Sequence, residues 1–127
     1  MPIILNIDHE RKEAHAVATG PIHYADIETH LLAEGNFQGL PYRELFDARD
    51  ATLMFSLSPS EIRSIVALVR TLSKESKLGP TAVIVADDFA FGIMHILEML
   101  LEDVAEIKPF RDEQLARAWL AAKSVEG

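Results

Sequence analysis

The apolar and polar positions of the N-terminal third predict two strands and a helix. Residues 3–7 are mostly apolar, and residues 13–19 place small apolar side chains at every second position, so we expect an antiparallel hairpin that turns at residues 8–10. Gly20 and Pro21 end the second strand. Residues 24–34 place Ile27 and Leu31 on one face, which predicts an amphipathic helix that ends at Gly35.

A strand, a polar loop and a long helix are predicted over residues 42–60 and beyond. We expect the strand at residues 44–46 and the loop from Asp47 onward. Ser58 and Glu61 have the spacing of a capping box, and Pro59 falls at the first helical position, where its missing N–H has no cost. The helix continues to about residue 77, with apolar residues spaced by three and four along one buried face.

A second strand, loop and helix are predicted over residues 81–103. Residues 82–86 are apolar without alternation, which is typical of a strand buried on both faces of a parallel sheet. A helix follows over residues 89–102, then a strand over residues 104–108 that Pro109 closes, and a helix over residues 112–123 with Leu115, Trp119 and Leu120 facing inward. The predicted order is ββαβαβαβα: one α/β domain over residues 1–127, with helices on both faces of a five-stranded mixed sheet.

Composition excludes several classes of function. The net charge is −8 and the pI is about 5.0, so nucleic acid and anionic membrane surfaces would repel the chain. The sequence has no cysteine, which rules out disulfides, thiol catalysis and zinc–thiolate sites and fits a cytoplasmic protein. No apolar run is long enough to cross a bilayer. We expect no cofactor, no metal and no membrane insertion.

The predicted order and three segments resemble a known fold. The segments are LFDARD, AVIVADDFAFGIMHILEML and FRDEQLARAWL, at residues 45–50, 82–100 and 110–120. Over nearly the whole chain they resemble the STAS fold and, more narrowly, its uncharacterised SpoIIAA-like branch, whose sheet is similar to that of CRAL-TRIO lipid-binding domains. The resemblance implies a non-catalytic protein-interaction or regulatory module. Anti-sigma-factor antagonists carry a phosphorylatable serine after the Asp that matches Asp47, but Ala48, Arg49 and Asp50 stand here, so the phosphorylation switch does not carry over.

Carboxylates are expected to gather where the central strands end, the edge at which parallel sheets bind ligands. One interpretation is a site for a polar ligand, or for magnesium or calcium, which prefer oxygen ligands. The other is structural: aspartates cap a helix or accept loop amides, and an arginine neutralises its neighbours. The residues concerned are Asp47, Arg49, Asp50, Asp87 and Asp88. The five histidines show no metal-ligand spacing, and we expect them at the surface or at edges.

The helix over residues 89–102 carries an unusually narrow polar stripe. At 100° per residue the stripe consists of His95, Glu98 and Glu102, and we expect Ile93, Leu97 and Leu100 to face the sheet. Large adaptable side chains near solvent suggest a surface that covers them. Those residues are Phe91, which falls within the stripe, and Met94 and Met99, which flank it.

Three interpretations of this helix remain open. In the first, the C-terminal helix with Trp119, or a neighbouring loop, covers it. In the second, a second copy of the chain binds it. In the third, it lines a pocket for an apolar ligand. The pocket interpretation involves a second apolar stretch at residues 53–57, in which Leu53, Met54 and Phe55 would contact the ligand. The sequence thus predicts a non-catalytic homodimeric interaction module that uses Phe91, Met94, His95 and Met99, with a carrier or sensor of a small lipid-like ligand as the alternative.

Overall fold

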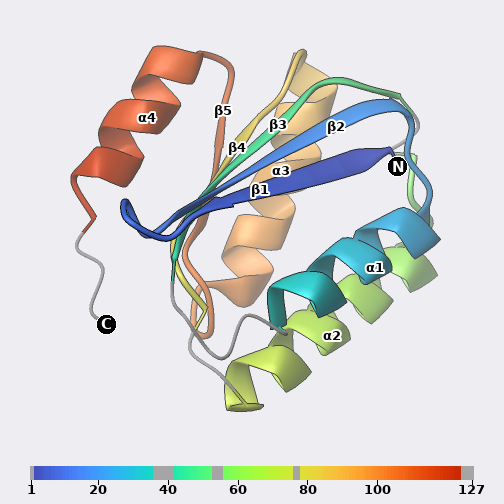
Figure 1. Ribbon diagram of the computed structural model, residues 1–127. Coiled ribbons are helices and arrows are strands. Elements are labelled where there is room, and N and C mark those ends of the chain that lie inside the picture. The colour runs from blue at the N-terminus through green and yellow to red at the C-terminus, as the bar shows by residue number, and fades with distance from the viewer. Residues whose placement is uncertain (1, 36–41, 53–55, 76–77, 124–127) are drawn as a thin grey trace.

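The computed structural model describes residues 2–35, 42–52, 56–75 and 78–123. The elements follow the order ββαβαβαβα, as the sequence predicts (Figure 1). They are β1 (Ile3–Asp8), β2 (Glu13–Pro21), α1 (Tyr24–Gly35), β3 (Arg43–Thr52), α2 (Pro59–Glu75), β4 (Thr81–Ile84), α3 (Asp88–Leu101), β5 (Ile107–Phe110) and α4 (Glu113–Ala121).

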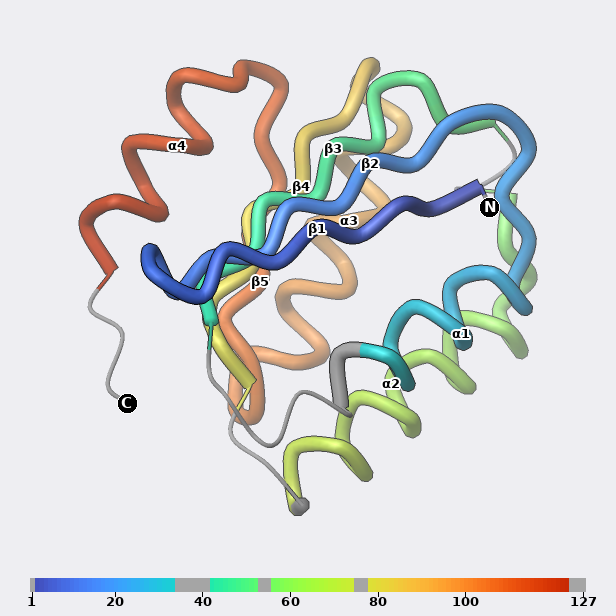
Figure 2. The backbone as a smooth tube through the Cα atoms, in the orientation of Figure 1, coloured from blue at the N-terminus to red at the C-terminus, as the bar shows by residue number. Residues whose placement is uncertain are grey.

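The five strands lie in the sheet in the same order as in the chain. β1 is antiparallel to β2, and every later neighbour is parallel, so the predicted mixed sheet is confirmed. A right-handed crossover that always steps to the next strand in one direction places each connecting helix on the same face. Accordingly α1, α2 and α3 cover one face of the sheet and α4 covers the other (Figures 1 and 2).

Each face of the sheet has its own hydrophobic core. The larger core joins the inner sides of α1, α2 and α3 to small residues of β2, including Ala16 and Ala18, and to Phe46 and Val83. The smaller core joins α4 to β3 and β4 through Leu45, Ala82, Ile84, Ala116 and Leu120. The strand over residues 82–84 contributes to both cores, which explains why it is apolar without alternation.

Several strand boundaries differ from the prediction. β2 includes Gly20 and Pro21, which were expected to end it, and β4 ends at Ile84. β3 continues through the expected loop to Thr52, because residues 50–52 pair with the end of β2 after a register shift between Val17 and Thr19. β5 begins at Ile107, three residues later than expected, and it contains Pro109, which was expected to end it. An edge strand tolerates a proline, because one side of it needs no ladder hydrogen bonds.

The inner face of α4 also differs from the prediction. Ala116 and Leu120 are buried against the sheet, whereas Leu115 is exposed and Trp119 is partly buried beside Phe110. Because α4 contacts β3, β4 and β5, it covers only that part of its face. Ile4 and Val17, which are partners across β1 and β2, stay exposed on the uncovered part.

The capping box is confirmed in the structure. The amide of Glu61 donates to Ser58 Oγ at 3.1 Å, and the amide of Ser58 donates to Glu61 Oε1 at 2.9 Å. Two donors that the first turn of α2 would leave unpaired are therefore satisfied.

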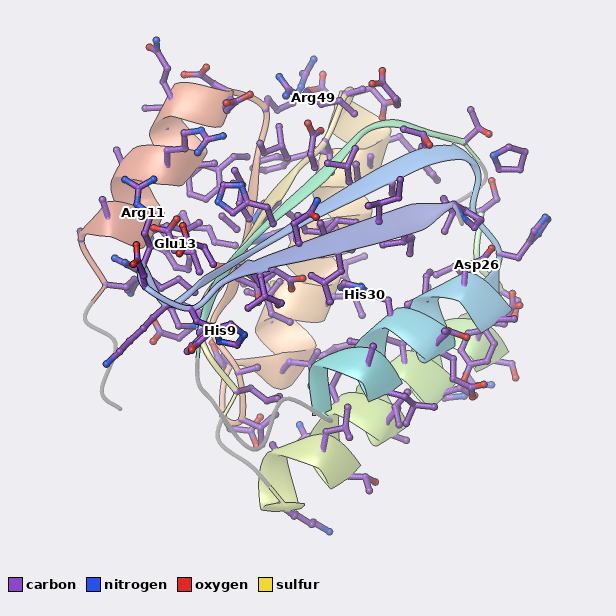
Figure 3. The ribbon with its side chains drawn as sticks, viewed as in Figure 1. His9, Arg11, Glu13, Asp26, His30 and Arg49 are labelled. Atoms are coloured by element: carbon purple, nitrogen blue, oxygen red, sulfur yellow. The ribbon has the colours of Figure 1, made fainter. Side chains whose placement is uncertain are left out.

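One histidine lies in the core, against the expectation that all five lie at the surface. His30 points from α1 toward the sheet, and its Nε2 lies 2.9 Å from Glu44 Oε2 on β3 (Figure 3). The Phe46 ring packs against the imidazole in a T-shaped arrangement, with the ring centroids 5.1 Å apart. Periodicity could not reveal this burial, because it depends on a carboxylate partner on a different element.

Candidate functional site

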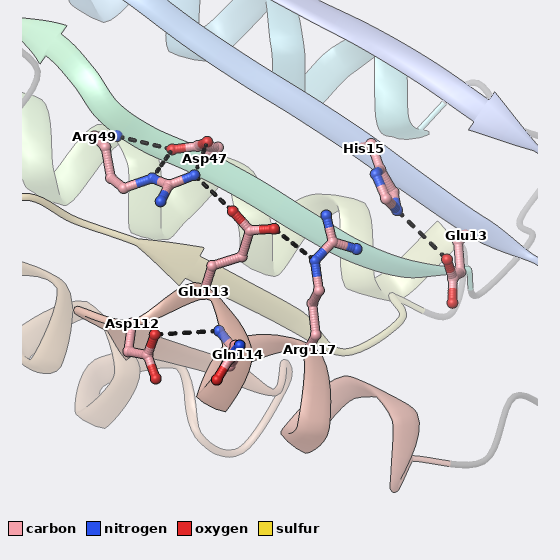
Figure 4. A network of polar contacts seen from close by, with 8 residues as sticks. All are labelled: Glu13, His15, Asp47, Arg49, Asp112, Glu113, Gln114 and Arg117. Carbon is pink, nitrogen blue, oxygen red and sulfur yellow. Dashed lines mark hydrogen bonds and ion pairs between the residues drawn. The ribbon is translucent and has the colours of Figure 1, made fainter.

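The carboxylates of the central strands belong to an ion-pair network rather than to a free binding edge. Arg49 donates from Nε and Nη2 to the two carboxylate oxygens of Asp47, at 3.0 and 2.7 Å (Figure 4). The same guanidinium donates to Glu113 at the start of α4, at 2.8 Å, and Arg117 donates to the other oxygen of Glu113. The network therefore ties β3 to α4 across the surface.

The network shifts the ionisation of its members. The hydrogen bond from Arg49 holds the pKa of the Asp47 carboxyl below its ordinary value, although partial burial opposes the shift. Hydrogen bonds from Arg117 and then from Arg49 lower the pKa of Glu113. The bonds to Asp47 and Glu113 raise the pKa of Arg49. All three groups are stabilised in their charged forms, which a general acid or base near neutral pH is not.

The other predicted residues of this edge have separate positions. Asp87 is the N-cap of α3, where its Oδ1 accepts from the amide of Ala90 at 2.8 Å. Asp88 forms an ion pair with Arg111, and Asp50 is exposed on β3. Within residues 2–35, 42–52, 56–75 and 78–123, no three His, Cys, Asp or Glu side chains are arranged to hold a metal ion.

The orientation of α3 is the main correction to the sequence analysis. The residues buried against the sheet are Ala90, Met94, Leu97 and Leu101. Met94 is only 7% exposed, so it lies in the core and not near solvent, and Leu100 is exposed where it was expected to face the sheet. Compared with the predicted orientation, the helix is rotated about its axis. Its polar stripe lies beside the buried side, whereas the prediction placed the stripe opposite to that side.

This rotation leaves an apolar surface on the outer side of α3. Four large side chains lie there around Gly92, which is also exposed. Their exposed fractions are 66% for Phe89, 49% for Ile96, 59% for Met99 and 48% for Leu100. We call Phe89, Gly92, Ile96, Met99 and Leu100 the α3 face. A soluble monomer rarely leaves so many large apolar side chains together in water.

Charged groups border the α3 face. Beyond its C-terminal end, Arg70 of α2 donates to both oxygens of Asp103, at 2.9 and 3.0 Å, and to the carbonyl of Leu100. At its N-terminal end stands the Asp88–Arg111 pair. An apolar centre with a polar rim is the usual anatomy of a protein–protein interface.

Two of the predicted surface residues flank this face. Phe91 is 37% exposed, and His95 is exposed with its Nδ1 3.0 Å from Glu98 Oε1. Met99 belongs to the α3 face itself. Trp119 packs against Phe110 of β5, in the core opposite to that of α3, so the C-terminal helix does not cover the α3 face.

The sequence analysis missed Phe89, Gly92 and Ile96. Their spacing of three and four residues, continued by Met99 and Leu100, was a detectable signal. The predicted contacts Leu53, Met54 and Phe55 of the apolar-ligand alternative lie outside the described residues. Leu57, at the end of that stretch, packs against the larger core.

The comparisons with known proteins agree with the fold. The sequence matches no protein-family model and no curated protein. Among solved structures, the chain is similar to an uncharacterised protein of the DUF3478 family with a SpoIIAA-like fold, from Shewanella loihica PV-4. The TM-score is 0.61, the sequence identity is 19%, and the match covers 93% of each chain. The fold is SpoIIAA-like, as the sequence resemblance implies. Among the described residues, no helix is long and apolar enough to cross a membrane.

Proposed function

We propose that the protein is a non-catalytic, STAS-like interaction module that forms a homodimer through the α3 face. The SpoIIAA-like fold fits such a module. Because the chain contains no cysteine, the reducing cytoplasm is a suitable setting. A second copy is the partner we propose, since two-fold association is the commonest form of protein assembly.

One observation carries the proposal. α3 buries one side in the core and turns an apolar side toward solvent, next to its polar stripe. Burial of apolar surface stabilises an association by about 25 cal/mol per Å² before the costs of association are subtracted. A partner on the α3 face would gain this stabilisation.

The polar edge supports a non-catalytic role. Asp47 and Arg49 are held in a bidentate ion pair, and Asp87 caps a helix. These contacts account for the aspartates that would otherwise suggest a reaction site. The segment that resembles the phosphorylation site of anti-sigma-factor antagonists is Asp47, Ala48, Arg49 and Asp50, which contains no serine.

Native mass spectrometry of the untagged protein tests the proposal, beside the variants Ile96→Glu and Leu32→Glu. Ile96 lies at the centre of the α3 face, whereas Leu32 is an exposed apolar residue of α1 and serves as the matched control. We expect dimers for the wild type and for Leu32→Glu, and a folded monomer for Ile96→Glu.

A wild-type monomer with the mass of the chain alone would refute the proposal. A wild-type monomer that carries the added mass of a lipid-like molecule would instead support the alternative, a carrier or sensor of a small apolar ligand.

A further inference from the structure

We infer that the two copies pair their α3 helices antiparallel, about a two-fold axis at Ile96, with Leu100 of each copy filling the space above Gly92 of the other. This inference rests on the proposed homodimer and adds its geometry. It follows from the spacing of the α3 face, from the free space at Gly92 and from the positions of the charges.

The α3 face has complementary sizes on either side of Ile96. In an antiparallel pair with the axis at Ile96, a residue four positions before it lies opposite the residue four positions after it. Gly92 of one copy then lies opposite Leu100 of the other, so the smallest residue of the face meets a large one. The two Ile96 side chains meet on the axis. A two-fold interface requires this kind of self-complementarity.

Gly92 is unexplained within a single chain. Its φ is not in the left-handed region, and a Cβ built on it has no heavy atom within 4 Å. A glycine in the middle of a helix costs about 0.5–1 kcal/mol relative to alanine. The lack of a side chain at this position allows a second backbone or side chain to approach closely, and this contact would offset the cost. Leu100 of the partner has the size to fill the space.

The charges of α3 fit the same arrangement. Glu98 and Glu102 lie on the polar stripe, about 120° to 160° around the helix from Ile96, so the carboxylates of the two copies stay apart. The position opposite Phe89 is Asp103, which is held by Arg70 of its own chain. The ring of Phe89 therefore meets a paired carboxylate beside a guanidinium, a group that binds well to aromatic rings.

Single-cysteine variants test the register, because the natural chain contains no cysteine. We would prepare Ile96→Cys, Gly92→Cys, Leu100→Cys and, as a control on the exposed surface of α1, Leu32→Cys. Each is oxidised alone, and Gly92→Cys is also mixed with isotope-labelled Leu100→Cys after exchange of the subunits. The mass of the cross-linked product identifies which chains are joined.

We expect Ile96→Cys to cross-link with itself, and Gly92→Cys to cross-link with Leu100→Cys in the mixture. Neither of the latter two should cross-link alone, because eight residues of helix separate the identical positions by about 12 Å along the axis, whereas the Cα atoms of a disulfide lie within about 7 Å. Leu32→Cys should not cross-link.

Self-linking of Gly92→Cys would show a parallel pairing or an antiparallel pairing in another register, and either would overturn the inference. A dimer in which the mixture gives no cross-link would also overturn it, while leaving the proposed homodimer intact. A wild-type monomer would refute the homodimer itself, so the two failures are distinguishable.

The variant Gly92→Leu gives an independent measurement. The single chain has room for the larger side chain, so the fold should be kept, but the space for Leu100 of the partner would be filled. We expect at least a tenfold weaker dimer, which is about 1.4 kcal/mol, and no change for the control Ala25→Leu on the exposed side of α1. An unchanged dimer would overturn the proposed contact.

Discussion

The buried pair of His30 and Glu44 gives the sharpest prediction about stability. The two side chains are 6% and 5% exposed, and they join α1 to the central strand β3. Replacing His30 by Leu keeps much of the volume but takes the imidazole away from a carboxylate in the core. Breaking a buried ion pair costs about 3–5 kcal/mol, and losing a neutral buried hydrogen bond costs about 1–3 kcal/mol. We therefore expect His30→Leu to lower the free energy of unfolding by about 3 kcal/mol.

The double variant His30→Leu/Glu44→Met provides the stronger test. Replacing both members of a buried ion pair by apolar residues of similar volume is often nearly neutral, whereas removing one member alone takes this contact away from the other, which stays buried. We expect the double variant to be more stable than either single variant. Urea unfolding, followed by circular dichroism at one fixed chain concentration, measures all of these free energies.

The matched control is His15→Leu. His15 also lies near a carboxylate, that of Glu13, at 3.4 Å, but its side chain is 41% exposed. Its replacement should change stability by less than about 0.5 kcal/mol. A cost below about 1 kcal/mol for His30→Leu, or costs of the two single variants that simply add in the double variant, would refute the reasoning.

Three further predictions concern other contacts. Arg49→Met should raise the pKa of Asp47, as measured by carboxyl NMR titration. Because the folded chain holds this pKa low, the wild type should lose the corresponding stability as the pH falls below about 4. The variant should not show this loss. Ser58→Ala should cost about 0.5–2 kcal/mol by loss of the helix cap, measured by urea unfolding. Leu101→Ala should lower the free energy of unfolding by about 2–5 kcal/mol, because Leu101 is 1% exposed. Leu100→Ala, made in the monomeric Ile96→Glu background, should lower it by less than about 1 kcal/mol. Equal costs would contradict the orientation of α3.

Local signals were enough to predict the order of the elements and the cap of α2. Ser58, Pro59 and Glu61 act on their own backbone, so their effect can be read from three neighbouring residues. The apolar run at residues 82–84 likewise indicates, without reference to any other segment, that this strand is buried on both faces. The extension of β3 depends instead on pairing with residues 19–21 of β2, which no local pattern records.

The orientation of α3 shows the limit of periodicity. A narrow polar stripe indicates which residues avoid the core only when the rest of the helix surface is buried. Here the sheet takes Ala90, Met94, Leu97 and Leu101, and the remaining apolar residues turn outward. The assignment of Leu100 to the core and of Met94 to the surface failed for this reason, while Phe91 and Met99 were placed near solvent correctly.

The sheet can be assembled while the chain is being synthesised. Every strand lies beside the strand that precedes it in the sequence, so each new strand finds its partner already made as it leaves the ribosome. The three crossover helices arrive between the strands and close the larger core in the same sequence. α4 follows β5 in the chain, and until it docks, Leu45, Ala82 and Ile84 have no helix over them. Docking of α4 is thus the step that removes the apolar side chains of β3 and β4 on this face from contact with water and chaperones.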